Sequence, residues 1–493
     1  MKVLNKLTAP KATAPERIIQ FGEGNFLRCF VDWIIKNLND KSDFNSSVVV
    51  LQGTTDGFVQ QLLEAQSCMY HVNLQGRVDG EVINSLERID VISRGVNPFV
   101  QFDAFLGLAD QPEMRFIISN TTEAGIAYDE TCKLGDRPAS SYPGKLTQLL
   151  WRRFTTFNGD PAKGFIILPC ELIFENGHHL KEIVNKYIDL WAADFGDKYE
   201  EFKAWFNNYN YVCATLVDRI VPGFPRKEIK QIQEKLGYLD NVVVQGEAFH
   251  LWVIEKASNM TIEELAAEFP VEKAGLNVII TESEAPYHER KVTLLNGPHT
   301  VLSPVSYLSG VDIVRDACNH EVLGKYIHKV QFDELMQTLN LPMEELQAYG
   351  ASVLERFNNP FVDHQVTSIM LNSFPKYQTR DLPGLKVYLE RKGELPKGLV
   401  LGLAAIITYY KGGKRADGAE IKPNDDVKIM DLLTELWATG DTRKVAEGVL
   451  GAKDLIWKEQ GNLNEIPGLT DLVVKYLDEI QEKGILETVK TIL

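Results

Sequence analysis

Short apolar runs alternate with longer amphipathic stretches over the first part of the chain. Several runs are continuous stretches of Val, Ile and Phe, as expected for parallel strands covered on both faces. Helical patterns at residues 26–38, 141–157 and 180–191 lie between strands. The alternation predicts an α/β domain built on a doubly wound sheet. Its predicted strands are residues 17–21, 47–52, 115–119, 165–168, 211–217, 241–245 and 277–281.

The pattern changes near residue 286, where strand-like runs almost vanish. The polar segment 282–286 is the predicted boundary, so we expect an N-terminal α/β domain over residues 1–285 and a mainly α-helical C-terminal domain over residues 286–493. The second domain is expected to carry the substrate and catalytic residues. Its predicted helices are residues 311–328, 331–339, 343–357, 362–371, 399–410, 427–438 and 469–482.

Composition limits the partners and the compartment. The 493 residues include 52 Lys plus Arg and 68 Asp plus Glu, a formal charge of −16, which works against nucleic acid or an anionic membrane as partner. The longest apolar stretch, residues 398–410, is too short to span a bilayer, and no apolar signal region opens the chain. Cysteines and histidines lack disulfide-frame or metal-ligand spacing. We expect a cytoplasmic protein with no metal site.

The first predicted strand runs into a glycine turn and then a helix. Gly22 allows a tight turn and Gly24 lets the backbone approach a pyrophosphate, so this segment predicts a Rossmann-like dinucleotide site. Leu27 replaces the third glycine of G-x-G-x-x-G, which leaves an ordinary strand–helix turn as the alternative. The candidate cofactor-binding residues are Ile18, Ile19, Gln20, Phe21, Gly22, Glu23, Gly24, Asn25, Phe26, Leu27, Arg28 and Cys29.

Two neighbouring strand ends bear on the cofactor. An acid after the second strand favours NAD; Asp56 comes late there, but no arginine is present to accept a 2′-phosphate. We therefore expect NAD, with a turn or cap role as the alternative for Asp56. Thr122 and Glu123 follow the strand at residues 115–119 and are further cofactor candidates, although they also suit a helix N-cap.

Lys291, Asn296 and His299 directly follow the predicted boundary. On an α-helix, Asn296 and His299 would lie about 140° and about 80° from Lys291, so all three could share one broad face. Pro298 should break or kink that helix. Lysine and histidine can serve as proton donor and orienting group, and asparagine can stabilise an oxyanion. The alternative is a surface lysine and a core histidine.

Two further polar clusters are substrate candidates. Asp218 ends a strand-like run, and His364 is followed by Lys376 and Arg380. Because Lys376 and Arg380 are spaced i, i+4, they could clamp a carboxylate together. Solvated charges or structural ion pairs are the alternative for each.

Together these segments resemble the mannitol dehydrogenase family of polyol-specific long-chain dehydrogenases/reductases. The resemblance rests on the family's K-x4-N-x2-H signature at Lys291, Asn296 and His299, its glycine motif at residues 22–28, and two segments at residues 218–220 and 356–360. It implies a Rossmann-like domain with a helical domain, an NAD(H)-dependent oxidoreductase without a metal, and Lys291 as general acid/base. Asn296 would stabilise the oxyanion, and His299 and Asp218 would hold substrate hydroxyls.

The chain also departs from the family pattern. Cys170, Glu171 and Leu172 stand where the pattern places an oxyanion-hole Asn after Cys-Asp, and Ser368 lies near the position of a polyol-binding arginine. Lys376 matches the family's substrate lysine. These departures put mannitol itself in doubt and suit a substrate with a carboxylate.

Five stretches, among them 15–33 and 289–300, are most similar to family members that act on hexuronates. That similarity implies interconversion of D-tagaturonate and D-altronate in hexuronate catabolism. A fructuronate reductase or a mannitol-type polyol dehydrogenase is the alternative among enzymes. A nucleotide-binding metabolite sensor is the alternative outside them, although a sensor need not retain Lys291 as a proton donor.

Overall fold

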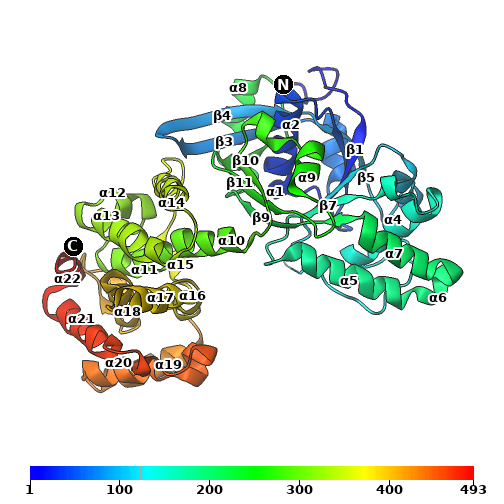
Figure 1. The fold of residues 1–493 in the computed structure, drawn as a ribbon. Coiled ribbons are helices and arrows are strands. Elements are labelled where there is room, and N and C mark those ends of the chain that lie inside the picture. Colours follow the sequence, from blue (N-terminus) through cyan, green and yellow to red (C-terminus); the bar gives the residue numbers. More distant parts are fainter. Residues whose placement is uncertain (123) are drawn as a thin grey trace. The chain divides into compact units, whose positions relative to one another are not determined.

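The computed structural model describes residues 1–122 and 124–493 (Figure 1). The chain divides into two compact units. The first unit comprises Met1–Gln75 and Ile83–Ala285, and the second comprises Gly76–Val82 and Pro286–Leu493. Each is described by itself.

A six-stranded parallel sheet forms the centre of the first unit, with the order β5-β2-β1-β6-β7-β8. Alternate residues face opposite cores: Ile18 packs into one and Ile19 into the other. This arrangement confirms the predicted doubly wound sheet. The strands are β1 Glu16–Phe21, β2 Ser47–Leu51, β5 Ile92–Val96, β6 Phe116–Ser119, β7 Ile166–Pro169 and β8 Tyr211–Val212.

Helices cover the two cores of this sheet. Side chains of α1 (Asn25–Cys29) and α2 (Val31–Lys41) fill one core. The other holds side chains of α4 (Tyr142–Thr156), α5 (Asn176–Leu190) and α7 (Tyr199–Tyr209). The unit's remaining α-helices are α3 Phe102–Gly107, α6 Ala192–Phe195, α8 Ile229–Leu236 and α9 Ile262–Glu268.

The predicted strand at residues 211–217 is two strands in two sheets. β8 closes the parallel sheet, whereas β9 (Ala214–Asp218) pairs antiparallel with β11 (Leu251–Glu255). β12 (Val278–Thr281) completes that three-stranded sheet. The sequence pattern shows a single apolar run here. Val212 and all of β9 are buried, and only Cys213 separates the two strands.

A hairpin of β3 (Tyr70–Val78) and β4 (Glu81–Ile89) belongs to a third sheet with β10 (Val244–Glu247). Its turn contains Asp79 and Gly80, both with positive φ, the sequence that a tight hairpin turn prefers. The tip falls in the second unit, where the N–H groups of Asp79 and Gly80 donate to Glu355 on α14 (Met343–Phe357) at 3.0 and 2.6 Å.

The second unit is helical, as predicted, apart from the tip of the β3–β4 hairpin and a short ribbon of β13 (Gly413–Lys414) and β14 (Glu420–Ile421). α18 (Lys397–Tyr409) is buried almost all round and packs against α11 (Gly297–Leu308). Among the described residues, no helix is long and apolar enough to cross a membrane. The other α-helices are α10 Ala285–Lys291, α12 Val314–Asn319, α13 Glu321–His328, α15 Val366–Met370, α16 Ser373–Arg380, α17 Leu382–Lys392, α19 Val427–Ala438, α20 Thr442–Leu450, α21 Leu469–Lys483 and α22 Ile485–Lys490.

Candidate active site

The glycine turn connects β1 to α1 in the first unit. Gly22 has φ +117°, a conformation that favours glycine, and its N–H donates to Leu51 O at 3.0 Å. A Cβ on Gly22 would lie 3.3 Å from Leu27 Cδ1. Leu27, which replaces the motif's third glycine, therefore packs over Gly22, and the small size of Gly22 gives it room.

Gly24 differs from Gly22, because it is exposed and has ordinary backbone angles. It is the N-cap of α1, and a Cβ built on it would meet nothing within 4 Å. The main chain at the start of α1 is therefore open on this side. An anion could approach its N–H groups closely, as the glycine motif predicts.

Arg28 holds this turn from within. Its guanidinium is buried and donates to Glu23 O at 2.9 Å, Asn25 Oδ1 at 2.8 Å and Val242 O at 2.5 Å. Because these bonds go to protein oxygens, Arg28 fixes the backbone of the turn. A contact between Arg28 and the cofactor stays a prediction.

A carboxylate does lie at the end of β2, but it comes from the glycine turn. Glu23 Oε2 accepts from the Gly53 N–H at 2.9 Å. Asp56, the acid considered from the sequence, is exposed. The acid that holds the adenosine ribose in dinucleotide-binding folds occupies this strand end, so Glu23 is better placed than Asp56 for that role.

The strand ends of β6 and β7 are tied together by a residue that sequence reasoning did not select. Glu171 is buried and accepts from Thr121 N and Oγ1, both at 2.9 Å, and from Ser119 Oγ at 3.1 Å. Burial raises the pKa of Glu171, while these hydrogen bonds oppose the shift. Leu172 beside it is 62% exposed and offers an apolar side chain where the family pattern has Asn.

Thr122 follows in the loop after β6 and has φ +71°. A threonine in this region is strained, so the surrounding structure holds it there. Glu123, the other cofactor candidate of this loop, lies outside the described residues.

Asp218 ends β9, and the loop after it packs against the glycine turn. Arg219 donates to Cys29 O at 2.6 Å, and a Cβ on Gly223 would lie 2.7 Å from Asn25 Nδ2. The structure therefore brings the Asp218 loop beside the predicted cofactor residues of the first unit. Asp218 itself is 6% exposed.

The Lys–Asn–His segment, residues 291–299, lies in the second unit and is helical throughout. α10 ends at Lys291, a π-helical turn spans Val292–Asn296, and α11 begins at Gly297. The helix therefore does not end at Pro298. The Gly297 N–H donates to Val292 O, five residues back, and this wider turn accommodates the proline and brings residues five apart closer than an α-helix would.

His299 is held among aromatic and positively charged groups. Its ring stacks on Phe357 with centroids 3.9 Å apart and meets His364 edge-on at 5.4 Å. Burial, together with His364, Arg356 and Arg380, holds the pKa of His299 well below its usual value, so the ring is neutral at pH 7. Its buried Nε2 has no hydrogen-bond partner within residues 1–122 and 124–493.

Lys376 and Arg380 lie one turn apart on α16, and Arg380 reaches the residue after His299. Arg380 Nη1 donates to Thr300 Oγ1 at 3.3 Å, one residue beyond His299, and Lys376 Nζ donates to Ile369 O at 2.6 Å. Both contacts are to uncharged oxygens. Burial lowers the pKa of Lys376, and the charge of Arg380 lowers it further. The structure therefore brings His299, His364 and Arg380 together, and Lys376 neighbours Arg380.

The described part of the chain holds no group of three or more His, Cys, Asp and Glu side chains arranged to bind a metal ion.

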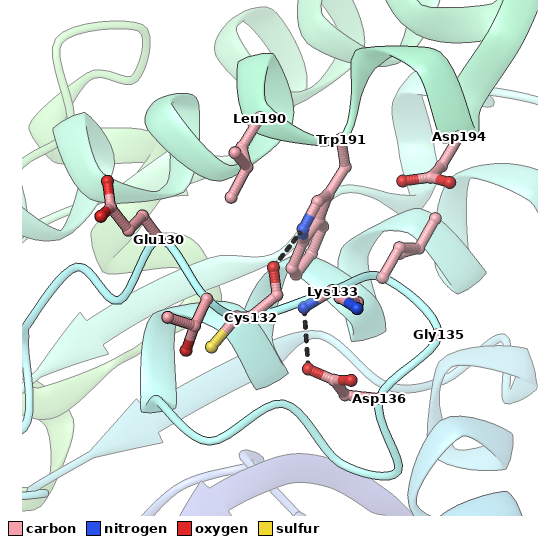
Figure 2. A pocket seen from close by; sticks show the side chains of 10 residues that line it. Glu130, Cys132, Lys133, Gly135, Asp136, Leu190, Trp191 and Asp194 are labelled. Carbon is pink, nitrogen blue, oxygen red and sulfur yellow. Dashed lines mark hydrogen bonds between the residues drawn. The ribbon is translucent and has the colours of Figure 1, made fainter.

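The first unit also contains a hollow of about 730 Å³ away from the predicted residues (Figure 2). There Trp191 Nε1 donates to Cys132 O at 2.9 Å and Lys133 N donates to Asp136 at 2.7 Å. None of the predicted site residues lines it. Its lining is Glu130, Thr131, Cys132, Lys133, Leu134, Gly135, Asp136, Leu190, Trp191 and Asp194.

Comparison with known proteins identifies both units. Residues 16–267 match the family model of the mannitol dehydrogenase Rossmann domain, and residues 285–481 match that of the mannitol dehydrogenase C-terminal domain. The altronate oxidoreductase of Phocaeicola vulgatus is 72% identical over 493 residues, which is 100% of both chains. That of Bacillus subtilis is 43% identical over 98% of this chain and 97% of its own.

Two solved structures share the fold. Substrate-free D-sorbitol dehydrogenase superposes with a TM-score of 0.80 at 20% identity, over 99% of this chain and 100% of its own. The Pseudomonas fluorescens mannitol 2-dehydrogenase ternary complex with NAD and D-mannitol gives 0.64 at 19% identity, over 100% and 99%. The resemblance in the sequence motifs is confirmed: the chain belongs to the mannitol dehydrogenase family.

Proposed function

We propose that the protein is an NAD(H)-dependent altronate oxidoreductase that interconverts D-tagaturonate and D-altronate. The observation that carries this proposal is the 72% identity, over the whole of both chains, to a relative named altronate oxidoreductase. A relative from Bacteroides thetaiotaomicron with the same name is 71% identical over the same length. The Lys–Asn–His segment suits proton transfer to the substrate, and Lys376 and Arg380 of α16 suit binding of its carboxylate.

The glycine turn fits a dinucleotide. Gly24 leaves the main chain at the start of α1 open, and Arg28 and Arg219 brace the turn through hydrogen bonds to backbone carbonyls. Glu23 at the end of β2 suits the two ribose hydroxyls of NAD and would repel a 2′-phosphate. When bound, NADH supplies the hydride for the reduction.

Lys291 is proposed to give a proton to the alkoxide oxygen formed on the substrate during reduction, and to remove it during oxidation. Asn296, brought closer by the π-helical turn, donates a hydrogen bond to the same oxygen. His299 is neutral, so its free Nε2 can accept or donate to a substrate hydroxyl depending on the tautomer.

Lys376 and Arg380 are proposed to bind the substrate carboxylate. The hydrogen bonds of both side chains go to uncharged oxygens, although Asp425 acts on Lys376 and Asp381 on Arg380. Arginine can bind a carboxylate through two parallel hydrogen bonds, and lysine adds a point charge. His364 is proposed to hold a hydroxyl group of the substrate.

The experiment is an assay of NADH oxidation with D-tagaturonate, D-fructuronate and D-fructose, repeated with NADPH. We expect the highest kcat/KM with D-tagaturonate and NADH. A preference for D-fructuronate or D-fructose would replace the proposed substrate while keeping the reaction class. Turnover of none of the three would overturn the proposal of an enzyme and favour a nucleotide-binding sensor.

A further inference from the structure

Asp381 is a buried acid with no evident function in the fold. It is fully buried, and neither carboxyl oxygen has a hydrogen-bond partner among the described residues. It occupies the N-cap of α17, where an Asp side chain normally accepts from the N–H of the second or third helical residue. Pro383 removes the first of these donors, and Asp381 makes no cap bond to the other.

The carboxyl lies instead against the start of α11. A Cβ on Gly297 would lie 3.0 Å from Asp381 Oδ1, so the two groups are in contact directly after Asn296. Gly297 must stay small to leave room for this oxygen. Asp381 therefore joins the α16–α17 junction, which carries Arg380, to the Lys–Asn–His segment.

The surroundings of Asp381 offer little to stabilise a negative charge. Tyr326 and Tyr377 face it, but their hydroxyls donate to Gly398 O at 2.9 Å and Leu399 O at 3.1 Å. Glu334, beyond them, accepts from the N–H groups at the start of α18 and adds a second acid. Burying a carboxylate without donors is costly, so the protonated form is favoured here.

Arg380 is the charged group that acts most directly on Asp381. Its charge lowers the pKa of Asp381, but burial raises that pKa well above the usual value. The same interaction acts on Arg380, because a negative charge on Asp381 would stabilise the charged guanidinium. An ionised Asp381 would therefore weaken the attraction of Arg380 for an anion.

We propose that Asp381 is a positioning residue that stays uncharged in the working enzyme, fills the space beside Gly297, and leaves the Arg380 charge to the substrate carboxylate. This inference rests on the proposed function, in which Arg380 binds that carboxylate. It adds a feature that affects substrate specificity. While Asp381 keeps its proton, it does not compete with the substrate carboxylate for the positive charge of Arg380.

The test compares KM and kcat of wild type and Asp381→Asn for D-tagaturonate from pH 6 to 10. The amide keeps the shape and cannot ionise, so we expect KM at pH 7 within about threefold of wild type. At alkaline pH we expect the wild-type KM to rise about tenfold more than that of the variant, the loss of one charge-assisted contact. Asp333→Asn, which changes an exposed acid of the same unit, is the control and keeps the wild-type profile.

Two kinetic results would overturn the inference: KM profiles of wild type and Asp381→Asn that coincide at every pH, or a variant KM raised more than tenfold at pH 7. Infrared spectroscopy of the free wild-type enzyme provides a measurement that needs neither substrate nor a folded variant. We expect the stretch of a protonated carboxyl to persist in wild type at pH 8. Where Asp381→Asn folds, the difference spectrum against wild type assigns the Asp381 component, because burial also raises the pKa of Glu334. If that band is absent from wild type at pH 7, Asp381 is ionised and the inference fails. Lack of turnover with an intact band would instead contradict only the proposed function.

Discussion

The glycine turn and the Lys–Asn–His segment use their polar side chains in opposite ways. In the turn, Arg28 and Arg219 donate to backbone carbonyls, so side chains shape the main chain, and the main chain at Gly24 is left open. In the second unit, the hydrogen bonds of Lys376 and Arg380 go to uncharged oxygens, and His299 Nε2 has no partner in the described part of the chain. Under the proposed function, the first region would recognise its ligand through the backbone and the second through side-chain charge and hydrogen bonding.

The largest effect is expected from Lys291→Ala. Loss of the proton donor should lower turnover of D-tagaturonate by roughly 10²–10⁴-fold, the range for general acid–base catalysis. NADH affinity should stay near that of wild type, because the substituted side chain belongs to the other unit. Steady-state kinetics and an NADH binding titration measure both quantities. Retention of more than about a tenth of the activity would mean that another group supplies the proton.

Arg28→Lys tests the supporting role of side chains in the glycine turn. Lysine cannot reproduce three hydrogen bonds in a fixed fork, so the free energy of unfolding of the first unit should fall by about 2–4 kcal/mol. Urea unfolding followed by fluorescence measures the loss. Arg152→Lys, which alters an exposed ion pair with Asp110 in the same unit, is the control and should cost less than about 1 kcal/mol. Equal losses in the two variants would contradict the role given to Arg28.

Arg380→Ala tests recognition by charge in the second unit. Losing a hydrogen bond to a charged group costs about 1.5–3 kcal/mol, so kcat/KM for D-tagaturonate should fall roughly ten- to a hundredfold. The effect on a neutral ketose should be much smaller. Lys392→Ala removes an exposed cation from the next helix and serves as the control. Equal losses on both substrates would make Arg380 structural.

Gly24→Val tests recognition by the backbone. The φ of Gly24 is −61° and its Cβ position is open, so valine should fold without strain and obstruct only a bound ligand. We expect NADH affinity to fall about tenfold, or about 1.4 kcal/mol, in isothermal titration. Gly107→Val, at a second glycine with open space around its Cβ, should bind NADH normally. Unchanged affinity in Gly24→Val would remove the turn from the cofactor site.

Features set by local pattern could be predicted from the sequence. Buried Val and Ile runs indicated the parallel sheet, and the i, i+4 spacing put Lys376 and Arg380 on one face of α16. The Asp79-Gly80 pair is a further local pattern, because Asp-Gly favours a tight hairpin turn, and it could have predicted the β3–β4 hairpin. The break that was one of the two expectations at Pro298 does not occur, because a π-helical turn precedes the proline and the chain stays helical.

Features set by distant partners could not be predicted. Glu171 is held by Ser119 and Thr121, some fifty residues away, and no local pattern predicts those bonds. From the sequence, Asp381 is an ordinary N-cap candidate. Only the structure shows that its carboxyl lies against Gly297. Likewise, the apolar run at residues 211–217 gives no sign that its halves pair in different sheets.

The most direct test of the account combines NADH binding with single-turnover NADH oxidation by D-tagaturonate in wild type, Gly24→Val and Lys291→Ala. The account predicts that Gly24→Val weakens binding yet retains most of the oxidation rate once saturated with NADH. Lys291→Ala should bind NADH like wild type and oxidise it roughly 10²–10⁴-fold more slowly. If Lys291→Ala weakens binding as much as Gly24→Val does, or Gly24→Val slows oxidation at saturation as much as Lys291→Ala, the division between backbone and side-chain recognition is contradicted.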